Sequence, residues 1–264
     1  MMKTTTPNKN ISFRKNPLSP FGRLKWNKYY WVYSRKEPVY EADYWGRVKD
    51  PDGKTRNLVD EWDQQVKNLS HLTDFLKSVK PGRILDVGCG PGFLLSALSN
   101  KWDKYGADIS QTALQRCSCY AKAYCGDLPS LRLKTGSFDV VVMNHVIEHL
   151  AKPLSYVAEI GRILKRGGVF IVATPDFDSA CARRFGKNFR MLHDNGHISL
   201  FNSFSLVKML EDYGFEIIKV EYPFFGTIWF TPENLNRMFD TRKVSPPFYG
   251  SHVVVYAYNR KKKR

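Results

Sequence analysis

The sequence lacks the long apolar runs that a membrane-spanning helix or a secretory signal needs. No stretch of about 18 apolar residues occurs in its 264 residues, and its first residues are polar and basic. Cysteine is also scarce: the five cysteines are odd in number and include no Cys-x-x-Cys pair, so a disulfide framework is not expected. We therefore predict a cytoplasmic protein with reduced thiols and no membrane span.

Positive charge is abundant but unevenly placed. The net charge is +16, yet residues 1–36 contain nine lysines and arginines and no acidic residue, and residues 260–264 contain five more basic residues. Removing these 14 from the 41 basic residues leaves 27 against 25 acidic residues in the rest of the chain. The body is therefore nearly neutral, which disfavours a nucleic-acid platform, and only the tails could contact an anionic surface.

The composition divides the chain into a basic, aromatic-rich extension (1–59), a main domain (60–259) and a basic tail (260–264). Tryptophan and tyrosine crowd residues 26–45. So many rings are too apolar to stay solvated. We expect this stretch to dock on the body, on a substrate or on a membrane surface.

From about position 58, helical patterns alternate with short apolar runs that are typical of buried parallel strands. The predicted helices are 58–79, 93–100, 110–121, 153–165 and 204–213. The predicted strands are 83–87, 104–108, 123–126, 138–143, 169–174, 216–222 and 252–258. Because parallel neighbours need long crossovers, this order predicts an α/β fold, a doubly wound, Rossmann-like, mostly parallel seven-stranded sheet with helices on both faces.

A glycine-rich loop follows the first strand of the main domain. Residues 86–92 read DVGCGPG and lead into a predicted helix. Glycines let the backbone turn sharply and let a ligand come close, which indicates nucleotide binding. A dinucleotide fingerprint has its third glycine one position later than Gly92, and Asp86 would repel a pyrophosphate but suit the ammonium of an amino-acid moiety. The loop therefore favours S-adenosylmethionine over NAD.

Two more aspartates end the next two predicted strands. Asp108 lies 20 residues beyond Gly88, where a carboxylate can accept hydrogen bonds from both ribose hydroxyls. Asp127 could accept a hydrogen bond from an adenine amino group. The order and spacing of these residues indicate one continuous site for an adenosyl cofactor.

Four motifs together resemble those of the class I S-adenosylmethionine-dependent methyltransferases: ILDVGCGPG (84–92), GADIS (106–110), FDVV (138–141) and LKRGG (164–168). The resemblance covers about residues 60–258. It implies that the loop holds the methionine part, that the Leu128 amide joins Asp127 at the adenine, and that Asn144 and His145 face the methionine portion and the sulfonium. The cofactor-binding residues that it implies are Asp86, Gly88, Gly90, Gly92, Asp108, Ile109, Asp127, Leu128 and Asn144.

Histidines near the predicted cofactor site are candidates for the reaction with the acceptor. Methyl transfer from a sulfonium is an in-line displacement, and a general base is needed only for a protonated acceptor such as a hydroxyl. Residues 145–149, HVIEH, also match an inverted zinc-protease pattern. They directly follow a strand where this fold keeps its cofactor, so we do not expect protease chemistry.

Residues 145–149 and the segment 175–201 resemble a subgroup related to the ubiquinone-biosynthesis O-methyltransferases, in which a Glu-His pair follows the fourth strand. The resemblance implies that 175–201 is a lid over the acceptor. We expect His145 or His193 to be the base for a hydroxyl acceptor, with substrate positioning or a structural role as the alternative for each. Some relatives use a divalent metal, but the pair Glu148-His149 alone does not establish one, and we predict a metal-independent site.

Three functions remain open at this point. The first and favoured one is methyl transfer to a small-molecule hydroxyl, in a sugar, a glycoconjugate precursor, or a quinone or aromatic ring. The second is RNA or DNA methylation, with the basic tails on phosphates and the aromatic stretch stacking on bases, although no Asn-Pro-Pro-Tyr-like motif is present. The third is a non-catalytic scaffold whose tails bind a partner or anionic lipid, which the intact cofactor residues disfavour.

Overall fold

A seven-stranded sheet forms the centre of the molecule in the computed structural model, which describes residues 24–33, 44–51, 53–223, 229–247 and 251–260. Its strands are β5 (Arg83–Val87), β6 (Asp103–Asp108), β7 (Lys122–Cys125), β8 (Phe138–Asn144), β9 (Leu164–Pro175), β11 (Phe215–Glu221) and β12 (His252–Asn259). The order is β11-β12-β9-β8-β5-β6-β7. The five strands from β9 to β7 are parallel, whereas β12 is antiparallel to both β9 and β11. The predicted fold class is confirmed.

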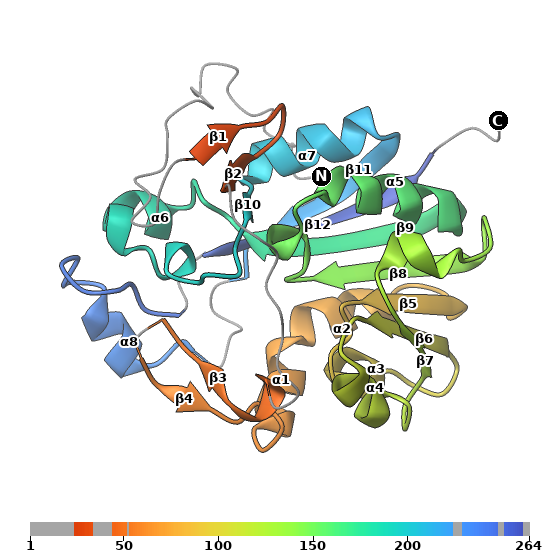
Figure 1. Cartoon of the computed structure of the whole chain (residues 1–264), viewed down its shortest axis with the longest axis horizontal. Coiled ribbons are helices and arrows are strands. Elements are labelled where there is room, and N and C mark those ends of the chain that lie inside the picture. Colours follow the sequence, from red (N-terminus) through yellow and green to blue (C-terminus); the bar gives the residue numbers. More distant parts are fainter. Residues whose placement is uncertain (1–23, 34–43, 52, 224–228, 248–250, 261–264) are drawn as a thin grey trace.

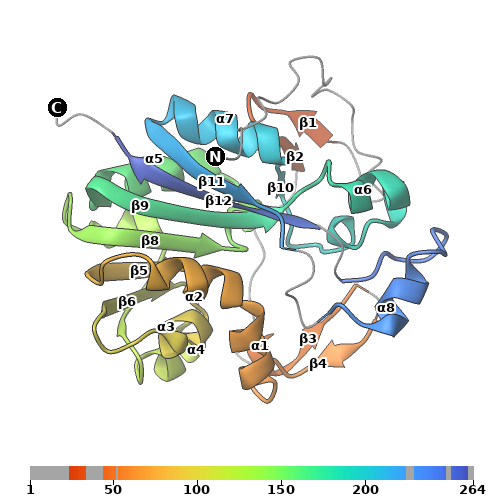
Figure 2. The same ribbon diagram turned by 180° about the vertical axis from the view of Figure 1, so that it is seen from behind.

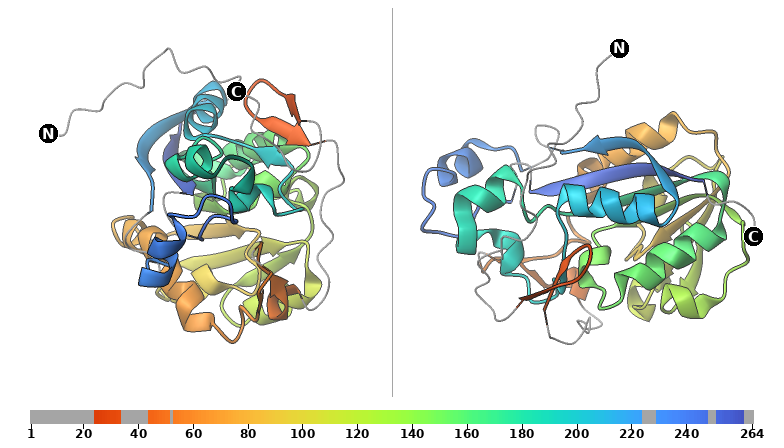
Figure 3. Two further views of the ribbon diagram at one scale, coloured as in Figure 1. Left: turned by 90° about the vertical axis from the view of Figure 1, so that its left-hand side faces the viewer. Right: turned by 90° about the horizontal axis from the view of Figure 1, so that it is seen from above.

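Helices cover both faces of the sheet. They are α1 (Trp62–Asn68), α2 (Ser70–Lys77), α3 (Phe93–Ala97), α4 (Gln111–Cys117), α5 (Pro153–Ile163) and α7 (Ser203–Asp212). Apolar side chains of α5 and α7 form one core with alternate residues of the central strands, and those of α2, α3 and α4 form a second core on the other face. The right-hand view of Figure 3 shows the sheet between these two helical layers.

Several predicted helices are shorter in the structure. The helix predicted over 58–79 is two helices, α1 and α2, which meet at Leu69, a residue outside helical geometry (φ −91°, ψ 9°). The helix predicted to reach position 100 ends at Ala97, because Leu98 is already extended (φ −84°, ψ 145°). Within the described ranges, no helix has the length and apolar character needed to span a bilayer.

Part of the aromatic extension docks on the body. The strands β1 (Leu24–Trp26) and β2 (Trp31–Tyr33) pair with β10 (Ser199–Leu200) of the predicted lid in a three-stranded antiparallel sheet. Tyr29 and Tyr30 are buried in the main core, and Tyr33 packs with Phe185 and Phe189 of the lid in a separate small core. The sequence left three docking places open: the body, a substrate and a membrane surface. Tyr29, Tyr30 and Tyr33 dock on the body. Most of the two basic tails lies outside the described residues.

The smaller elements gather where the parallel strands end. They are α6 (Ala180–Phe185), α8 (Pro232–Arg237), β3 (Val48–Lys49) and β4 (Thr55–Arg56). Figures 1 and 2 show them together at the end of the sheet to which β8 points, and the left-hand view of Figure 3 looks onto that end. This is the edge where open α/β sheets bind their ligands.

Candidate active site

The loop after β5 has a backbone that only glycine adopts easily. Gly88, Gly90 and Gly92 all have positive φ, at 70°, 51° and 96°. A Cβ atom on Gly88 would lie 2.3 Å from Cγ2 of Val146, so a side chain is excluded there by space as well. The three glycines that the sequence singled out are therefore required by the conformation of the loop.

Asp108, at the end of β6, is bound to this loop. The Gly90 N–H donates to its Oδ2 and the Ser110 N–H donates to its Oδ1, both at 2.8 Å. Burial raises the pKa of Asp108, although these backbone hydrogen bonds oppose the change. Each carboxylate oxygen can still accept another hydrogen bond. Asp108 and the half-exposed Ile109 line the same cavity of about 250 Å³, as the predicted ribose contact requires.

The far end of this first cavity is formed by residues that follow β7. Asp127 is exposed, and Leu128 is buried beside it. The hydroxyl of Tyr156, from α5, donates to Asp127 Oδ1. This bond orients the carboxylate, whose second oxygen can accept from an amino group. Tyr156 could not be predicted as part of the site from the sequence, because it lies 29 positions away in a helix.

Asp86, the last polar residue of β5, is a buried carboxylate. It is 5% exposed and lines a second cavity, of about 360 Å³, together with Gly88, Cys89 and Asn144. Burial and the nearby charge of Asp108 raise the pKa of Asp86 to about 8. A cationic group brought beside it would favour the ionised form, so this position suits the ammonium of a methionine moiety.

This pKa leads to a testable pH dependence. In the free protein Asp86 is mostly protonated below about pH 8, and binding of an ammonium requires its ionised form. Cofactor affinity should therefore rise with pH, by up to about tenfold per unit, over the range from about pH 6 to pH 7.5, below the titration of the ligand's own amino group. Calorimetry across this range checks the slope. The Asp86→Asn variant should bind more weakly and lose the slope; a slope that survives in it would contradict this role.

The second cavity lies between the sheet and the lid. Besides the loop after β5, it is lined by His145 and Glu148, by Arg190 and His197 of the lid, and by parts of the N-terminal extension. His145 also lines the first cavity. The structure therefore places His145 where the predicted cofactor pocket meets the space beneath the lid.

His145 is held in an unusual position. Its φ is +54°, a left-handed conformation that is uncommon for residues other than glycine. The His145 N–H donates to the Ala173 carbonyl oxygen (2.9 Å), and Nδ1 of its ring lies 3.1 Å from Glu148 Oε1. Strained backbone of this kind persists where the surroundings impose it, often at functional sites.

Glu148 is completely buried beneath His145. The Thr174 hydroxyl donates to Glu148 Oε2 (3.0 Å), so both carboxylate oxygens are bound. Burial alone would raise the pKa of Glu148, but the hydrogen bond with His145 and the nearby imidazoles of His149 and His197 outweigh it and lower the pKa to about 2. Glu148 is therefore an anion that orients the ring of His145 and stabilises a positive charge on it.

The structure does not bring His193, the second predicted base, to either cavity. His193 follows the 3-10 helix Arg190–Leu192, and its Nε2 lies 2.9 Å from the Lys187 carbonyl oxygen. It is absent from the residues that line the first and second cavities. The geometry thus favours His145 over His193 for contact with an acceptor.

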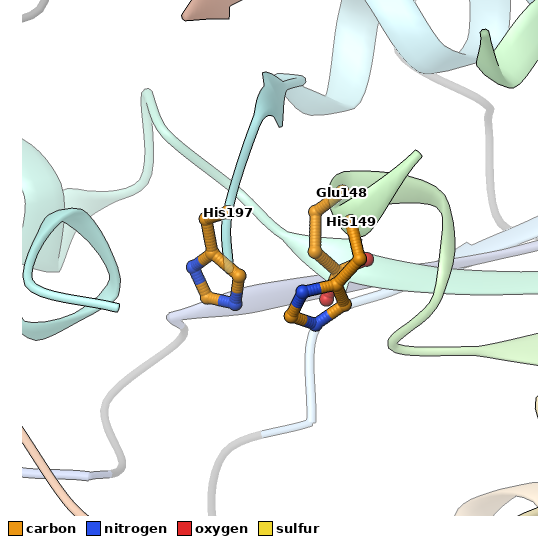
Figure 4. Close-up of side chains that lie close together, drawn as sticks. All are labelled: Glu148, His149 and His197. Carbon is orange, nitrogen blue, oxygen red and sulfur yellow. The ribbon is translucent and has the colours of Figure 1, made fainter. Parts of the chain in front are cut away.

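A different histidine of the lid reaches the site. The Ile198 N–H donates to the Glu148 carbonyl oxygen (2.7 Å), which holds the lid against the 3-10 helix Ile147–His149. As a result the side chains of Glu148, His149 and His197 meet, with possible ligand atoms all within 4.8 Å of one another. Figure 4 shows them side by side, two from the turn after β8 and one from the lid.

These three side chains could hold a divalent cation. His149 Nδ1 donates to the Gly196 carbonyl oxygen (2.9 Å), and His197 Nδ1 donates to that of Met191 (2.6 Å). A carbonyl can only accept, so each Nδ1 carries a proton, and in the neutral ring each Nε2 then keeps a lone pair, which is how histidine ligands are oriented at metal sites. The metal-independent site that the sequence predicts stays a prediction. The sequence did not show that His197 lies beside Glu148 and His149.

The N-terminal extension also contributes to both cavities. Tyr44 and Trp45, in the short helix Tyr44–Gly46, line each of them. The Trp45 ring lies over the glycine loop so closely that a Cβ atom on Gly90 would be 2.5 Å from Trp45 Cζ2. Docking of the aromatic stretch is predictable from its composition, but a crowded run of rings gives no signal for which ring reaches the loop.

Comparison with known proteins agrees with this geometry. Residues 59–220 match the family model of the methyltransferase domain. An uncharacterised protein of Methanocaldococcus jannaschii is 27% identical over 191 residues, which cover 72% of each chain. A ubiquinone biosynthesis O-methyltransferase of a Ruegeria species is 28% identical over 156 residues, or 50% of this chain and 59% of that enzyme, so the match spans less than two thirds of it.

The fold has counterparts among solved structures. A S-adenosylmethionine-dependent methyltransferase of Thermotoga maritima superposes with a TM-score of 0.56 at 22% sequence identity, over 77% of this chain and 95% of that one. At this identity the likeness concerns the fold.

Proposed function

Because this chain belongs to the methyltransferase domain family and uses S-adenosylmethionine as its cofactor, we propose that it methylates a hydroxyl group of a small molecule with His145 as general base. The observation that supports this most is the position of His145, at the junction of the two cavities and hydrogen-bonded to a buried anionic glutamate. An amine acceptor, neutral at its nitrogen, would need no such base.

The residues of the first cavity serve the cofactor in this proposal. Asp108, with Ile109 beside it, binds the ribose, and Asp127 with the Leu128 amide binds the adenine. The loop Gly88, Gly90 and Gly92, together with Asp86 and Asn144, surrounds the methionine part. The hydrogen bonds that already fix Asp108 and Asp127 support these roles, because they hold both carboxylates in place before the ligand arrives.

In the reaction, the acceptor oxygen attacks the methyl carbon in line with the sulfonium. The new carbon–oxygen bond forms as the carbon–sulfur bond breaks, and the electron pair of the broken bond stays on sulfur. The hydroxyl proton passes to Nε2 of His145, since Nδ1 faces Glu148. The resulting imidazolium is stabilised by the Glu148 carboxylate, whose pKa of about 2 keeps it ionised.

The acceptor is a sugar, a glycoconjugate precursor, or a quinone or aromatic ring. The named O-methyltransferase relative supports hydroxyl chemistry. Labelled methyl transfer to a panel of catechols, quinols, sugars and sugar phosphates tests the proposal, with the methylated atom identified by nuclear magnetic resonance. We expect methyl ethers from wild type and none from Asp108→Ala, which lacks the ribose contact. Label that enters only nucleic acid or nitrogen would contradict the proposal.

A divalent cation fits the chemistry of Glu148, His149 and His197. Held there, it would supply a Lewis acid that lowers the pKa of an acceptor hydroxyl. We expect cobalt(II) added to the metal-free protein to give the visible absorption of a histidine-carboxylate site, and His197→Ala to lose it while His193→Ala keeps it. A spectrum without such bands would support the metal-independent site expected from the sequence.

A further inference from the structure

A third cavity opens beside the reaction site. It has a volume of about 550 Å³ and is formed by the β3–β4 hairpin, α1, α8 and Arg190, the first residue of the 3-10 helix Arg190–Leu192 in the lid. Asp50 and Arg190 line both this cavity and the second one, so the two are neighbours. Figure 1 shows the contributing elements at the open end of the sheet.

The third cavity is strongly basic, in contrast with the nearly neutral body. Its basic residues are Lys54, Arg56, Lys67, Arg190 and Arg237, against Asp50 and Glu233. Arg56 pairs with Glu61 and lies 3.8 Å from Asp50. Among the residues that the structure describes, Lys54 and Lys67 form no ion pair with a carboxylate. Several cations thus share one cavity with fewer anions, an arrangement that an anionic ligand would stabilise.

Arg190 connects the basic cavity with the reaction site. Its side chain is only 6% exposed, and its Nη2 lies 3.7 Å from Asp50 Oδ1, longer than a hydrogen bond. The Arg190 N–H donates to Ser245 Oγ (3.0 Å), which fixes the backbone at this point. The Arg190 side chain lines both cavities, so an anion that enters either of them can come within reach of its guanidinium.

The walls of the cavity are ordered by packing and hydrogen bonds. The guanidinium of Arg56 lies 4.4 Å from the centre of the Trp229 ring. Asn234 is 8% exposed; its Nδ2 donates to the Trp229 carbonyl oxygen (2.9 Å), and its Oδ1 accepts from Arg237 Nη1 (3.2 Å). These contacts hold two of the arginines in place, so the positive charge is presented by fixed groups and not by mobile side chains alone.

We propose that the methyl acceptor carries a phosphate or diphosphate group, which the basic cavity binds through Arg190 and the lysines while the acceptor hydroxyl lies at His145. This rests on the proposed function and narrows its substrate class to phosphorylated small molecules. A phosphate fits better than a single carboxylate because it carries more negative charge and more acceptor oxygens. A continuous nucleic-acid strand would need a basic track along the surface, which the near neutrality of the body does not offer.

Inorganic pyrophosphate is the probe that tests this. We expect it to bind the wild-type protein in calorimetry, with an affinity that falls as salt rises. The double variant Lys54→Gln/Lys67→Gln should weaken binding about two- to thirtyfold, as two surface ion pairs allow. The matched control Lys80→Gln/Lys152→Gln removes the same charge from exposed positions away from the cavity and should bind as wild type does. Pyrophosphate binding that is absent, or equally weak in both double variants, would overturn the proposal.

Two further measurements separate this inference from the proposed function. The lysine variants should bind S-adenosylmethionine like wild type, and they should lose turnover of phosphorylated acceptors more than turnover of neutral ones. If His145-dependent methylation is found with neutral acceptors only, the phosphate inference falls and the O-methyltransferase proposal stands. If a short single-stranded RNA competes for the cavity better than pyrophosphate, a nucleic-acid acceptor replaces the small molecule.

Discussion

The His145→Asn variant is expected to lose about 10²- to 10⁴-fold in the rate of methyl transfer to a hydroxyl acceptor, the range that general-base catalysis supplies. Asparagine is a better replacement than alanine here, because His145 has a φ of +54° and asparagine tolerates this left-handed backbone conformation. The substitution therefore removes the base without adding backbone strain. Single-turnover rates at saturating S-adenosylmethionine measure the effect on the transfer step separately from any change in cofactor affinity, which calorimetry reports, because His145 also lines the first cavity.

An acceptor with a more acidic hydroxyl makes this experiment decisive. If His145 removes the proton, an acceptor that is already ionised at the assay pH needs no base, and the variant should lose much less with it. Loss of equal size for both acceptors would assign His145 a positioning role. His193→Asn, at the other predicted base, should remain near wild type, because His193 faces the Lys187 carbonyl outside both cavities.

The Gly88→Ala variant is expected to lose at least about 100-fold in cofactor affinity. The new methyl group would meet Val146 Cγ2 at 2.3 Å and would also force alanine to a φ of 70°. The left-handed backbone costs about 1–2 kcal/mol by itself. The overlap with Val146 must be relieved by moving the loop that binds the cofactor, and a displacement of this kind removes several hydrogen bonds at once, each factor of ten in affinity being 1.4 kcal/mol. Titration calorimetry measures the change.

Gly167 provides a matched control for this variant. Its φ is 76°, but a Cβ atom there would meet nothing within 4 Å. Gly167→Ala should therefore lose a similar 1–2 kcal/mol of unfolding free energy and bind the cofactor normally. The pair separates backbone strain from the blocked loop. If Gly167→Ala weakens cofactor binding as much as Gly88→Ala does, general destabilisation explains both.

The features predicted correctly from the sequence are those that depend on neighbouring residues. The alternation of apolar strands and amphipathic helices determines a doubly wound sheet, and the observed strand order agrees with it. The loop glycines could be identified because a positive φ at each of them requires glycine whatever surrounds it. Helix ends were less accurate, since they depend on single residues such as Leu69 and Leu98 that leave helical geometry.

The features that the sequence did not provide are contacts between segments that lie far apart in the chain. His193 and His197 occur in the same lid, and nothing in their local sequence distinguishes them. Backbone bonding of Ile198 to Glu148 decides which one enters the site. The contact of Tyr156 with Asp127 and that of Arg190 with Asp50 depend in the same way on how distant elements pack. Such pairs need a structure, because no spacing rule connects them.

The small sheet of β1, β2 and β10 has a consequence for the order in which the molecule assembles. Its central strand comes from the start of the described chain and its partner β10 from the lid, with the whole nucleotide-binding half of the main sheet between them in the sequence. Closing so long a loop costs entropy, which is offset by two residue pairs with β10, by the small core with the lid, and by Tyr29 and Tyr30 in the main core. This sheet should form late in folding and exchange its amide hydrogens before the central strands do. Because β10 begins two residues after His197, opening of the sheet would loosen the wall of the second cavity that His197 forms.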